Sequence, residues 1–240
     1  MAIFPDLVTA KILISERGGP MGKTETMTDA ATDTRKPDVD AEHWGRVYET
    51  TADDAVSWYE PEPRASLEAF ALADIPVRAS LVDVGAGSSR LVEHLLDRGA
   101  TDLTVVDIAS SAFETPRSRL GSRASKVDWA VADVTQWRSD RLFDVWHDRA
   151  VFHFMTEPAQ RDGYRAALRK ATSAGAWLVI ATFADDGPER CSGLPVKRYS
   201  GPGLIAEFAS DFVAHDVWRD EHRSPGGVIQ PFTWAVMRRR

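Results

Sequence analysis

The segment LVDVGAGSSR, residues 81–90, decides the fold of this chain. An apolar run that includes Asp83 is followed by Gly85, Ala86 and Gly87, and the residues after them have a helical pattern. Glycine tolerates backbone conformations that other residues avoid and has no side chain, so the backbone of such a loop can approach a bound ligand closely. The segment therefore predicts a strand, a cofactor-binding loop and a helix, but it does not by itself identify the cofactor.

The sixth position of the glycine loop disfavours a dinucleotide cofactor. The dinucleotide fingerprint G-x-G-x-x-G/A ends in a small residue that lets the helix pack tightly against the strand, whereas this chain has Arg90 there. Asp107 ends an apolar run about 20 residues after the glycines, where a strand-end carboxylate can accept both hydroxyls of a ribose. Asp107 thus predicts a nucleoside cofactor and leaves its type open.

Composition predicts one domain and disfavours several kinds of partner. With 240 residues, of which 43% are hydrophobic and eight are tryptophan, the chain can bury one sizeable core. A formal net charge of -7 argues against nucleic acid as a partner, because nucleic-acid affinity depends on clustered cations. The single cysteine, Cys191, favours a reducing cytoplasm, and no metal-ligand spacing such as H-E-x-x-H occurs, so no metal is expected. No run approaches the roughly 20 apolar residues that cross a bilayer, so no membrane partner is expected.

The beginning of the chain differs in composition from the rest. Residues 19–40 are rich in Thr, Asp, Gly and Pro and have almost no large apolar side chains, so they cannot bury enough surface to offset the entropy of ordering. We expect residues 1–39 to be a disordered leader and residues 40–240 to form the functional domain.

Within residues 40–240, apolar runs and helical patterns alternate. Strands are expected near residues 80–85, 102–107, 127–132, 142–148 and 175–183. Helices are expected near residues 41–51, after Pro63, and near residues 88–98, 110–120, 158–171 and 202–209, with Asp40 as the N-cap of the first. This alternation is typical of a doubly wound, mostly parallel sheet with helices on both faces. Two β-rich runs at 211–222 and 231–239, separated by Ser224-Pro225-Gly226-Gly227, predict a C-terminal antiparallel hairpin.

At this point the chain resembles the class I, seven-stranded S-adenosylmethionine-dependent methyltransferases, and among them small bacterial members without a known substrate. The matching segments are Val82-Asp83-Val84-Gly85-Ala86-Gly87, Val105-Val106-Asp107, Val131-Ala132-Asp133-Val134 and Phe143-Asp144-Val145-Trp146-His147-Asp148, in that order and at family-like spacing. The four segments together are far more specific than a glycine loop alone. One departure is Ser89, which stands where many relatives have a third glycine, and its hydroxyl can cap the following helix.

The resemblance implies S-adenosyl-L-methionine as the cofactor and a set of residues that hold it. Asp83 and the loop backbone would contact the methionine end, Asp107 the ribose, and Asp133 with Val134 the adenine. The cofactor-binding residues that we predict are Asp83, Gly85, Ala86, Gly87, Asp107, Ile108, Asp133, Val134, Trp44 and Tyr48.

Methyl transfer from a sulfonium is an in-line displacement in which the protein mainly positions the reactants. Asp148, at the end of the fourth strand, is a candidate to orient an acceptor or act as general base, with an N-cap or an ion pair to Arg149 as the alternative. Arg149 is a candidate clamp for an acidic substrate, with a surface ion pair as the alternative. His153 has a side chain suited to proton removal near neutral pH, but between Phe152 and Phe154 it is equally compatible with a buried structural histidine.

Aromatic residues and the lone cysteine give two further hypotheses. Trp44, Tyr48, Trp58 and Tyr59 would form a lid that excludes water and favours the positive sulfonium, or would simply be core residues of two helices, the interpretation favoured for Trp58 and Tyr59. Cys191 lies near Arg190 and Lys197, whose charges would lower its pKa and make it reactive, although a lone cysteine is more often a packed residue.

We therefore predict a methyltransferase that acts on a small-molecule acceptor. The alternatives are a protein-residue methyltransferase, for example one acting on lysine, for which the acidic surface would attract a basic target, a NAD-dependent oxidoreductase, and a non-catalytic cofactor-binding module. The sequence does not identify the acceptor or the oligomeric state.

Overall fold

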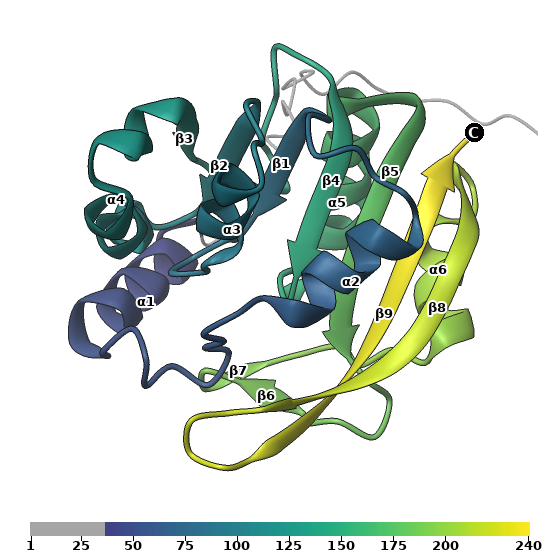
Figure 1. Cartoon of the computed structure of the whole chain (residues 1–240). Coiled ribbons are helices and arrows are strands. Elements are labelled where there is room, and N and C mark those ends of the chain that lie inside the picture. Colours follow the sequence, from purple (N-terminus) through teal and green to yellow (C-terminus); the bar gives the residue numbers. More distant parts are fainter. Residues whose placement is uncertain (1–36) are drawn as a thin grey trace, which may run out of the picture. The chain divides into compact units, whose positions relative to one another are not determined.

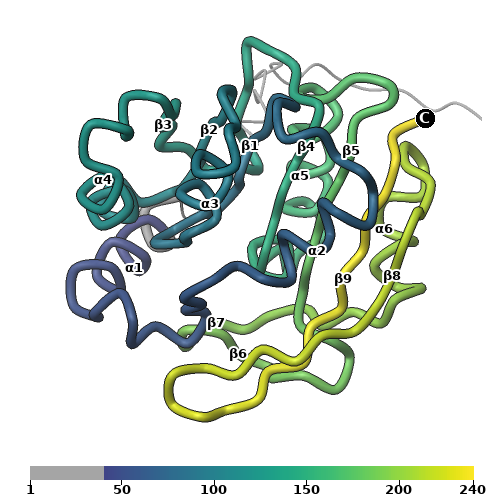
Figure 2. Tube along the Cα trace, in the orientation of Figure 1, coloured from purple at the N-terminus to yellow at the C-terminus, as the bar shows by residue number. Residues whose placement is uncertain are grey.

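The computed structural model describes residues 37–240, so the predicted leader at residues 1–39 lies almost wholly outside the described residues and remains a prediction. A seven-stranded sheet with the order β3-β2-β1-β4-β5-β9-β8 is the centre of the fold (Figures 1 and 2). Its strands are β1 (Leu81–Val84), β2 (Leu103–Asp107), β3 (Val127–Val131), β4 (Phe143–Arg149), β5 (Thr172–Phe183), β8 (Phe212–Arg223) and β9 (Ile229–Arg239). The first five run parallel, and β9 is antiparallel to both β5 and β8.

Helices cover both faces of the sheet, because the central strands are apolar on both sides and would otherwise expose those side chains to water (Figure 1). The first face packs against α2 (Arg64–Leu72), α3 (Leu91–Asp97), η1 (Ser110–Phe113) and α4 (Glu114–Leu120), with side chains of α1 (Pro37–Thr50) added to the same core. The second face packs against η3 (Phe152–Phe154), α5 (Pro158–Ala171) and α6 (Gly201–Phe208). The remaining elements are η2 (Gly121–Lys126) and the short pair β6 (Arg190–Cys191) and β7 (Leu194–Pro195).

The structure confirms the predicted fold class. The doubly wound sheet, the helices on both faces and the antiparallel β8–β9 hairpin are all present, and the hairpin turns at residues 224–228. One helix boundary was wrong: α1 begins at Pro37, so Asp40 lies inside the helix instead of capping it. Proline is well tolerated in a first helical turn, where its missing N–H has no intrahelical partner to lose.

Side chains alternate between the two faces along each strand, and this alternation positions the functional residues. In β4, Val145 belongs to the core under α2, while Trp146 belongs to the core under α5. His147 and Arg149 therefore point to the α2 face and Asp148 to the α5 face. Among the described residues, no helix is long and apolar enough to cross a membrane.

Candidate active site

The glycine loop lies at the carboxyl end of β1, where open α/β sheets bind their ligands. Gly85 and Gly87 have φ angles of 59° and 53°, in the left-handed region that favours glycine. A Cβ on Gly85 would collide with the side chain of Val151, and one on Gly87 would collide with the hydroxyl of Tyr48. Both glycines are therefore required by backbone conformation and by close neighbours.

Asp107 is the last residue of β2, and its carboxylate is hydrogen-bonded to the backbone of this loop. One carboxylate oxygen accepts the N–H of Gly87 and the other accepts the N–H of Ala109, both at 3.0 Å. Burial raises the pKa of Asp107 to about 6, although the backbone N–H groups of Ala109, Gly87 and Ile108 partly offset the effect. Asp107, which was predicted to bind the ribose, is thus adjacent to the glycine loop, and its role toward a ribose stays a prediction.

The far end of the loop is held by its serine and by an arginine of α4. Ser89 Oγ accepts the N–H of Leu91, the first residue of α3, at 3.1 Å, although Arg90 and not Ser89 stands at the N-cap position. Arg119 donates to the carbonyls of Ser88 and Ser89 at 3.0 and 2.9 Å and forms an ion pair with Asp53 at 2.6 Å. Arg119 therefore connects the loop to the segment that follows α1.

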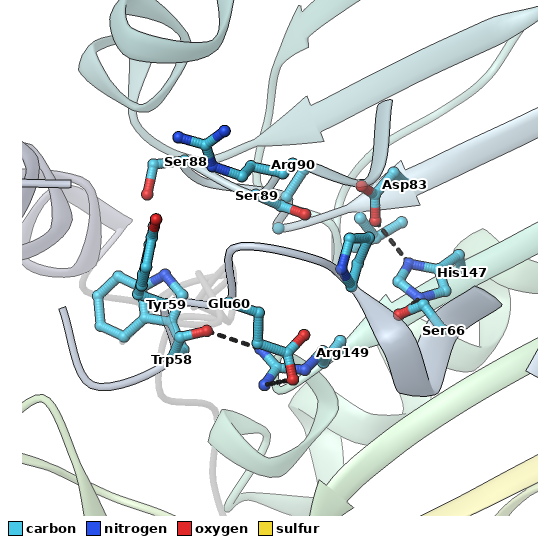
Figure 3. A pocket seen from close by; sticks show the side chains of 14 residues that line it. Trp58, Tyr59, Glu60, Ser66, Asp83, Ser88, Ser89, Arg90, His147 and Arg149 are labelled. Atoms are coloured by element: carbon cyan, nitrogen blue, oxygen red, sulfur yellow. Dashed lines mark hydrogen bonds and ion pairs between the residues drawn. The ribbon is translucent and has the colours of Figure 1, made fainter. Parts of the chain in front are cut away.

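A pocket opens beside this loop, and Figure 3 shows its side chains. Its residues come from the segment between α1 and α2, the glycine loop and the end of β4, and include Trp58, Tyr59, Glu60, Asp83, Ala86 and Arg149. The predicted residues Asp83, Gly85, Ala86 and Arg149 are thereby brought together at one site.

Asp83 has one carboxylate oxygen with a hydrogen-bond partner and one without. Its Oδ1 lies 2.7 Å from Nδ1 of His147, its register partner on β4, and Nε2 of His147 lies 2.9 Å from Oγ of Ser66 on α2. All three residues are at most 2% exposed. The second oxygen of Asp83, Oδ2, is buried and has no hydrogen-bond partner among the described residues.

Arg149 forms the opposite wall of the pocket together with Glu60 (Figure 3). The guanidinium lies 3.0 Å from the Glu60 carboxylate and donates to the carbonyl of Trp58 at 3.1 Å. His222 of β8 approaches the same carboxylate with Nδ1 at 3.4 Å. Burial alone would raise the pKa of Glu60, but the hydrogen bond from His222 and the charges of Arg149, His222 and Arg64 outweigh it and lower the pKa. Arg149 is thus paired with Glu60 and not with its neighbour Asp148.

The predicted aromatic lid is a cluster beside the glycine loop. The ring of Trp44 lies 5.8 Å from Trp58, 6.2 Å from Tyr48 and 5.2 Å from Phe154, centroid to centroid. Burial raises the pKa of Tyr48 well above its usual value, and the charge of Asp107 adds to the shift. Trp58 lines the pocket and contacts both Trp44 and Tyr48, so it belongs to this cluster, contrary to the interpretation favoured for it from the sequence.

Asp148 lies on the other face of the sheet. It is fully buried, accepts the N–H groups of Val151 and Phe152 at 2.8 and 3.1 Å, and accepts the hydroxyl of Tyr164 at 2.5 Å. Burial raises the pKa of Asp148 to about 6 despite these donors. The geometry supports the capping alternative: Asp148 braces the turn that carries Val151, which in turn packs against Gly85.

His153 and Cys191 are both buried. His153 accepts the N–H of Phe183 at 3.3 Å, and burial lowers its pKa to about 3, an effect to which the charge of Arg149 adds. This supports the alternative of a buried structural histidine. The hypothesis of an acidic thiol was wrong, because burial raises the pKa of Cys191 to about 11, and Lys197, one of the two expected cations, is paired with Glu207.

The predicted adenine residues follow β3. Asp133 accepts the N–H and the hydroxyl of Thr135, both at 2.8 Å, and the side-chain amide of Gln136 at 2.9 Å, while Val134 is buried. These bonds fix the turn after β3. The role of Asp133 and Val134 toward adenine stays a prediction.

Sequence reasoning did not find His147, Ser66, Glu60 or His222. The only local signal was for His147, because strand alternation places it on the same face as Asp83 in the neighbouring strand. The other three come from the segment before α2, from α2 itself and from β8, and no local pattern links them to the pocket. Among residues 37–240, no group of three or more His, Cys, Asp or Glu side chains is placed to hold a metal ion.

Fold and site together define a doubly wound α/β protein with a nucleoside-binding loop at the carboxyl end of β1. Residues 81–175 match a sequence family described as a methyltransferase domain. Nodulation protein S from Rhizobium tropici is 26% identical over 132 residues, which are 55% of this chain and 54% of that protein, so the chain spans about half the length of the curated relative. The match includes the glycine loop, Asp107, Asp133 and β4, the segments that carry the resemblance to the class I S-adenosylmethionine-dependent methyltransferases.

Two solved structures share the fold. The N-methyltransferase NodS from Bradyrhizobium japonicum, in complex with S-adenosylhomocysteine, is 16% identical, with a TM-score of 0.61 over 82% of this chain and 98% of that one. The 1,6-didemethyltoxoflavin-N1-methyltransferase from Burkholderia thailandensis, with bound 1,6-didemethyltoxoflavin and S-adenosylhomocysteine, is 22% identical, with a TM-score of 0.60 over 84% of both chains. At these identities the similarity establishes the fold and does not transfer a substrate.

Proposed function

We propose that this protein transfers the methyl group of S-adenosyl-L-methionine to a small-molecule acceptor. The observation that carries the proposal is the glycine loop, which lines the pocket with Gly85 and Ala86 and is bonded at Gly87 to the buried carboxylate of Asp107. The match of residues 81–175 to a methyltransferase domain and the order of the strands also support S-adenosyl-L-methionine as the cofactor. The orphaned Oδ2 of Asp83 supports the fit, because it is a buried acceptor for which the described residues supply no donor.

The pocket and the strand ends next to it each hold one part of the cofactor in this proposal. Asp83 and the loop from Gly85 to Gly87 hold the amino-acid part of the cofactor, Asp107 with Ile108 holds the ribose, and Asp133 with Val134 holds the adenine. When bound, the cofactor supplies an electrophilic methyl group on a positively charged sulfur. Trp44, Tyr48 and Trp58 exclude water and offer ring faces to that positive charge.

The acceptor lies next to Arg149 in this proposal. Because the guanidinium is already paired with Glu60, the two side chains present both a donor and an acceptor and can orient a neutral polar substrate. Asp148 and His153 are sealed in the core, so we assign neither of them a proton transfer, and positioning carries the catalysis. Both solved structures above are named as N-methyltransferases, so nitrogen is the first acceptor atom to test. We place the reaction in the cytoplasm.

Two measurements test the proposal. Calorimetry with S-adenosylhomocysteine should show binding by the native protein and at least tenfold weaker binding by Asp107→Ala, because the ribose loses a charged acceptor. NADH should not bind, and stabilisation by NADH without stabilisation by S-adenosylhomocysteine would overturn the cofactor assignment.

The acceptor class is tested with methyl-labelled cofactor and a cell lysate. We expect label in the small-molecule fraction. Label confined to protein would replace the small-molecule acceptor with a protein residue, and binding of the cofactor without any transfer would leave only a binding module.

A further inference from the structure

A buried chain of hydrogen bonds runs from Ser66 through His147 to Asp83. It joins α2, β4 and β1, three segments that are far apart in sequence, and its contacts measure 2.9 and 2.7 Å. All three residues line the pocket (Figure 3). Polar groups that are at most 2% exposed cost free energy unless they are hydrogen-bonded, and one atom of this chain, Oδ2 of Asp83, has no partner among the described residues.

The bond to His147 fixes the orientation of the Asp83 carboxylate. A carboxylate only accepts hydrogen bonds, so the imidazole must donate its Nδ1–H to Oδ1, and Ser66 holds the ring from the other side at Nε2. With Oδ1 occupied in this way, Oδ2 is directed away from the ring (Figure 3). Oδ2 is the buried acceptor that has no partner among the described residues.

The other cations of the pocket are already paired. Arg149 is bound to Glu60 at 3.0 Å, and Arg90 lies 3.8 Å from Glu93 and over the ring of Tyr59. Neither forms an ion pair with Asp83 among the residues that the structure describes. The unpaired oxygen therefore suits a cationic N–H donor that arrives with the ligand.

We propose that His147 and Ser66 are positioning residues that aim Oδ2 of Asp83 at the α-ammonium group of the bound cofactor. The inference rests on the proposed function and deepens it, because it assigns the orientation of the Asp83 carboxylate to His147 and Ser66. An ammonium group carries three N–H donors and a positive charge, which satisfy a buried carboxylate oxygen better than a neutral donor does.

The contacts from Ser66 to His147 and from His147 to Asp83 are those of a hydrolase catalytic triad, but the surroundings of Ser66 differ from those of a nucleophilic serine. Ser66 is 1% exposed and lies on the buried face of α2, together with Ala65, Ala69 and Phe70. The hydroxyl lies where α2 packs on the sheet and is bonded to Nε2 of His147, so we assign it to holding the ring and not to nucleophilic attack. The arrangement is suited to holding Asp83 in place.

The test uses two ligands that differ only in the ammonium group: S-adenosylhomocysteine and its desamino analogue, in which hydrogen replaces the α-amino group. Calorimetry should show that the native protein binds the first at least tenfold more tightly. In His147→Leu this preference should fall to within about threefold, while affinity for the desamino analogue stays within about threefold of native. His147→Asn, whose amide N–H replaces Nδ1–H, should restore most of the preference.

Ser66→Ala extends the test and keeps it valid if His147→Leu does not fold. It should lower the preference by about threefold, because the ring is held from one side only. Ser80→Ala is the matched control: it removes a serine hydroxyl that donates to Asp144 at 2.9 Å, just before β1, and should leave the preference unchanged.

Three results are decisive. If the native protein binds neither ligand, the proposed function fails. If it binds both ligands equally, or if His147→Leu and Ser66→Ala weaken both ligands by the same factor, the positioning inference fails and the proposed function stands.

Discussion

The two faces of β4 at its carboxyl end differ sharply although they share one strand. His147 and Arg149 point to the α2 face and line the pocket, whereas Asp148, between them, points to the α5 face and is sealed by Tyr164. Both oxygens of the Asp148 carboxylate, on the sealed face, accept hydrogen bonds from the protein. Asp83 of β1, whose carboxylate lies on the pocket face, has one oxygen without a hydrogen-bond partner among the described residues. A charged residue at a strand end is therefore informative about function only together with the face to which it points.

The largest expected effect concerns the sealed face. Asp148→Ala leaves two backbone N–H groups and the hydroxyl of Tyr164 without an acceptor, and should lower the free energy of unfolding by about 3 kcal/mol. Urea unfolding at pH 7 measures the loss. Affinity of the folded fraction for S-adenosylhomocysteine should change by less than about threefold.

Asp148→Asn keeps an acceptor oxygen and should lose less stability than Asp148→Ala. If a variant at Asp148 keeps the native free energy of unfolding but loses tenfold or more in turnover, Asp148 takes part in the reaction. The distinction between a sealed face and a pocket face of β4 would then be wrong.

The second prediction separates two buried carboxylates with the same pKa. Burial raises the pKa of both Asp107 and Asp148 to about 6, above the value of 3.8 for an unburied aspartate, so both gain protons as the pH falls through 6. Only Asp107 must be ionised to accept two ribose hydroxyls. Affinity for S-adenosylhomocysteine should therefore be constant above pH 7 and about tenfold weaker at pH 5.

Calorimetry at a series of pH values checks this dependence. Asp107→Asn should bind weakly with little change over the same range, and Asp148→Asn should keep the native dependence. If the dependence disappears in Asp148→Asn and survives in Asp107→Asn, the assignment of pocket and sealed carboxylates is reversed.

The smallest effect is expected at Cys191. Its thiol is buried and its pKa is raised to about 11, so almost no thiolate exists at neutral pH. Cys191→Ser should retain turnover within about twofold, and iodoacetamide should modify the native protein slowly. Rapid modification with loss of activity would show that the thiol belongs to the reactive part of the site.

The fold could be predicted from the sequence because its signals are local. The apolar run before Gly85, the Asp that ends β2 and the turn at Pro225 each describe a few adjacent residues, and the chain order of strands and helices follows from them. The contact between Gly87 and Asp107 also follows, since parallel neighbouring strands bring their carboxyl ends together.

The rest of the site depends on contacts between distant segments. Ser66 reaches His147 only because α2 docks on the sheet, and Glu60 meets His222 only because β8 folds back toward the segment before α2. The face of Asp148 was also hidden, because β4 carries polar residues on both of its faces and is largely buried on both, so its alternation gives no contrast between inside and outside. Knowing that His147 is the register partner of Asp83 would have shown that Asp148 points to the opposite face, but this register is set by the pairing of β1 with β4.

The direction of β9 has a practical consequence. Because this strand runs opposite to β1–β5, the residues that follow it leave the sheet at the edge where the parallel strands begin, and Arg240 bonds there to the carbonyl of Asp211 (Figure 1). The pocket opens at the other edge, next to α1. A fluorescent fusion or a surface-coupling tag attached after Arg240 would therefore leave the ligand entrance clear.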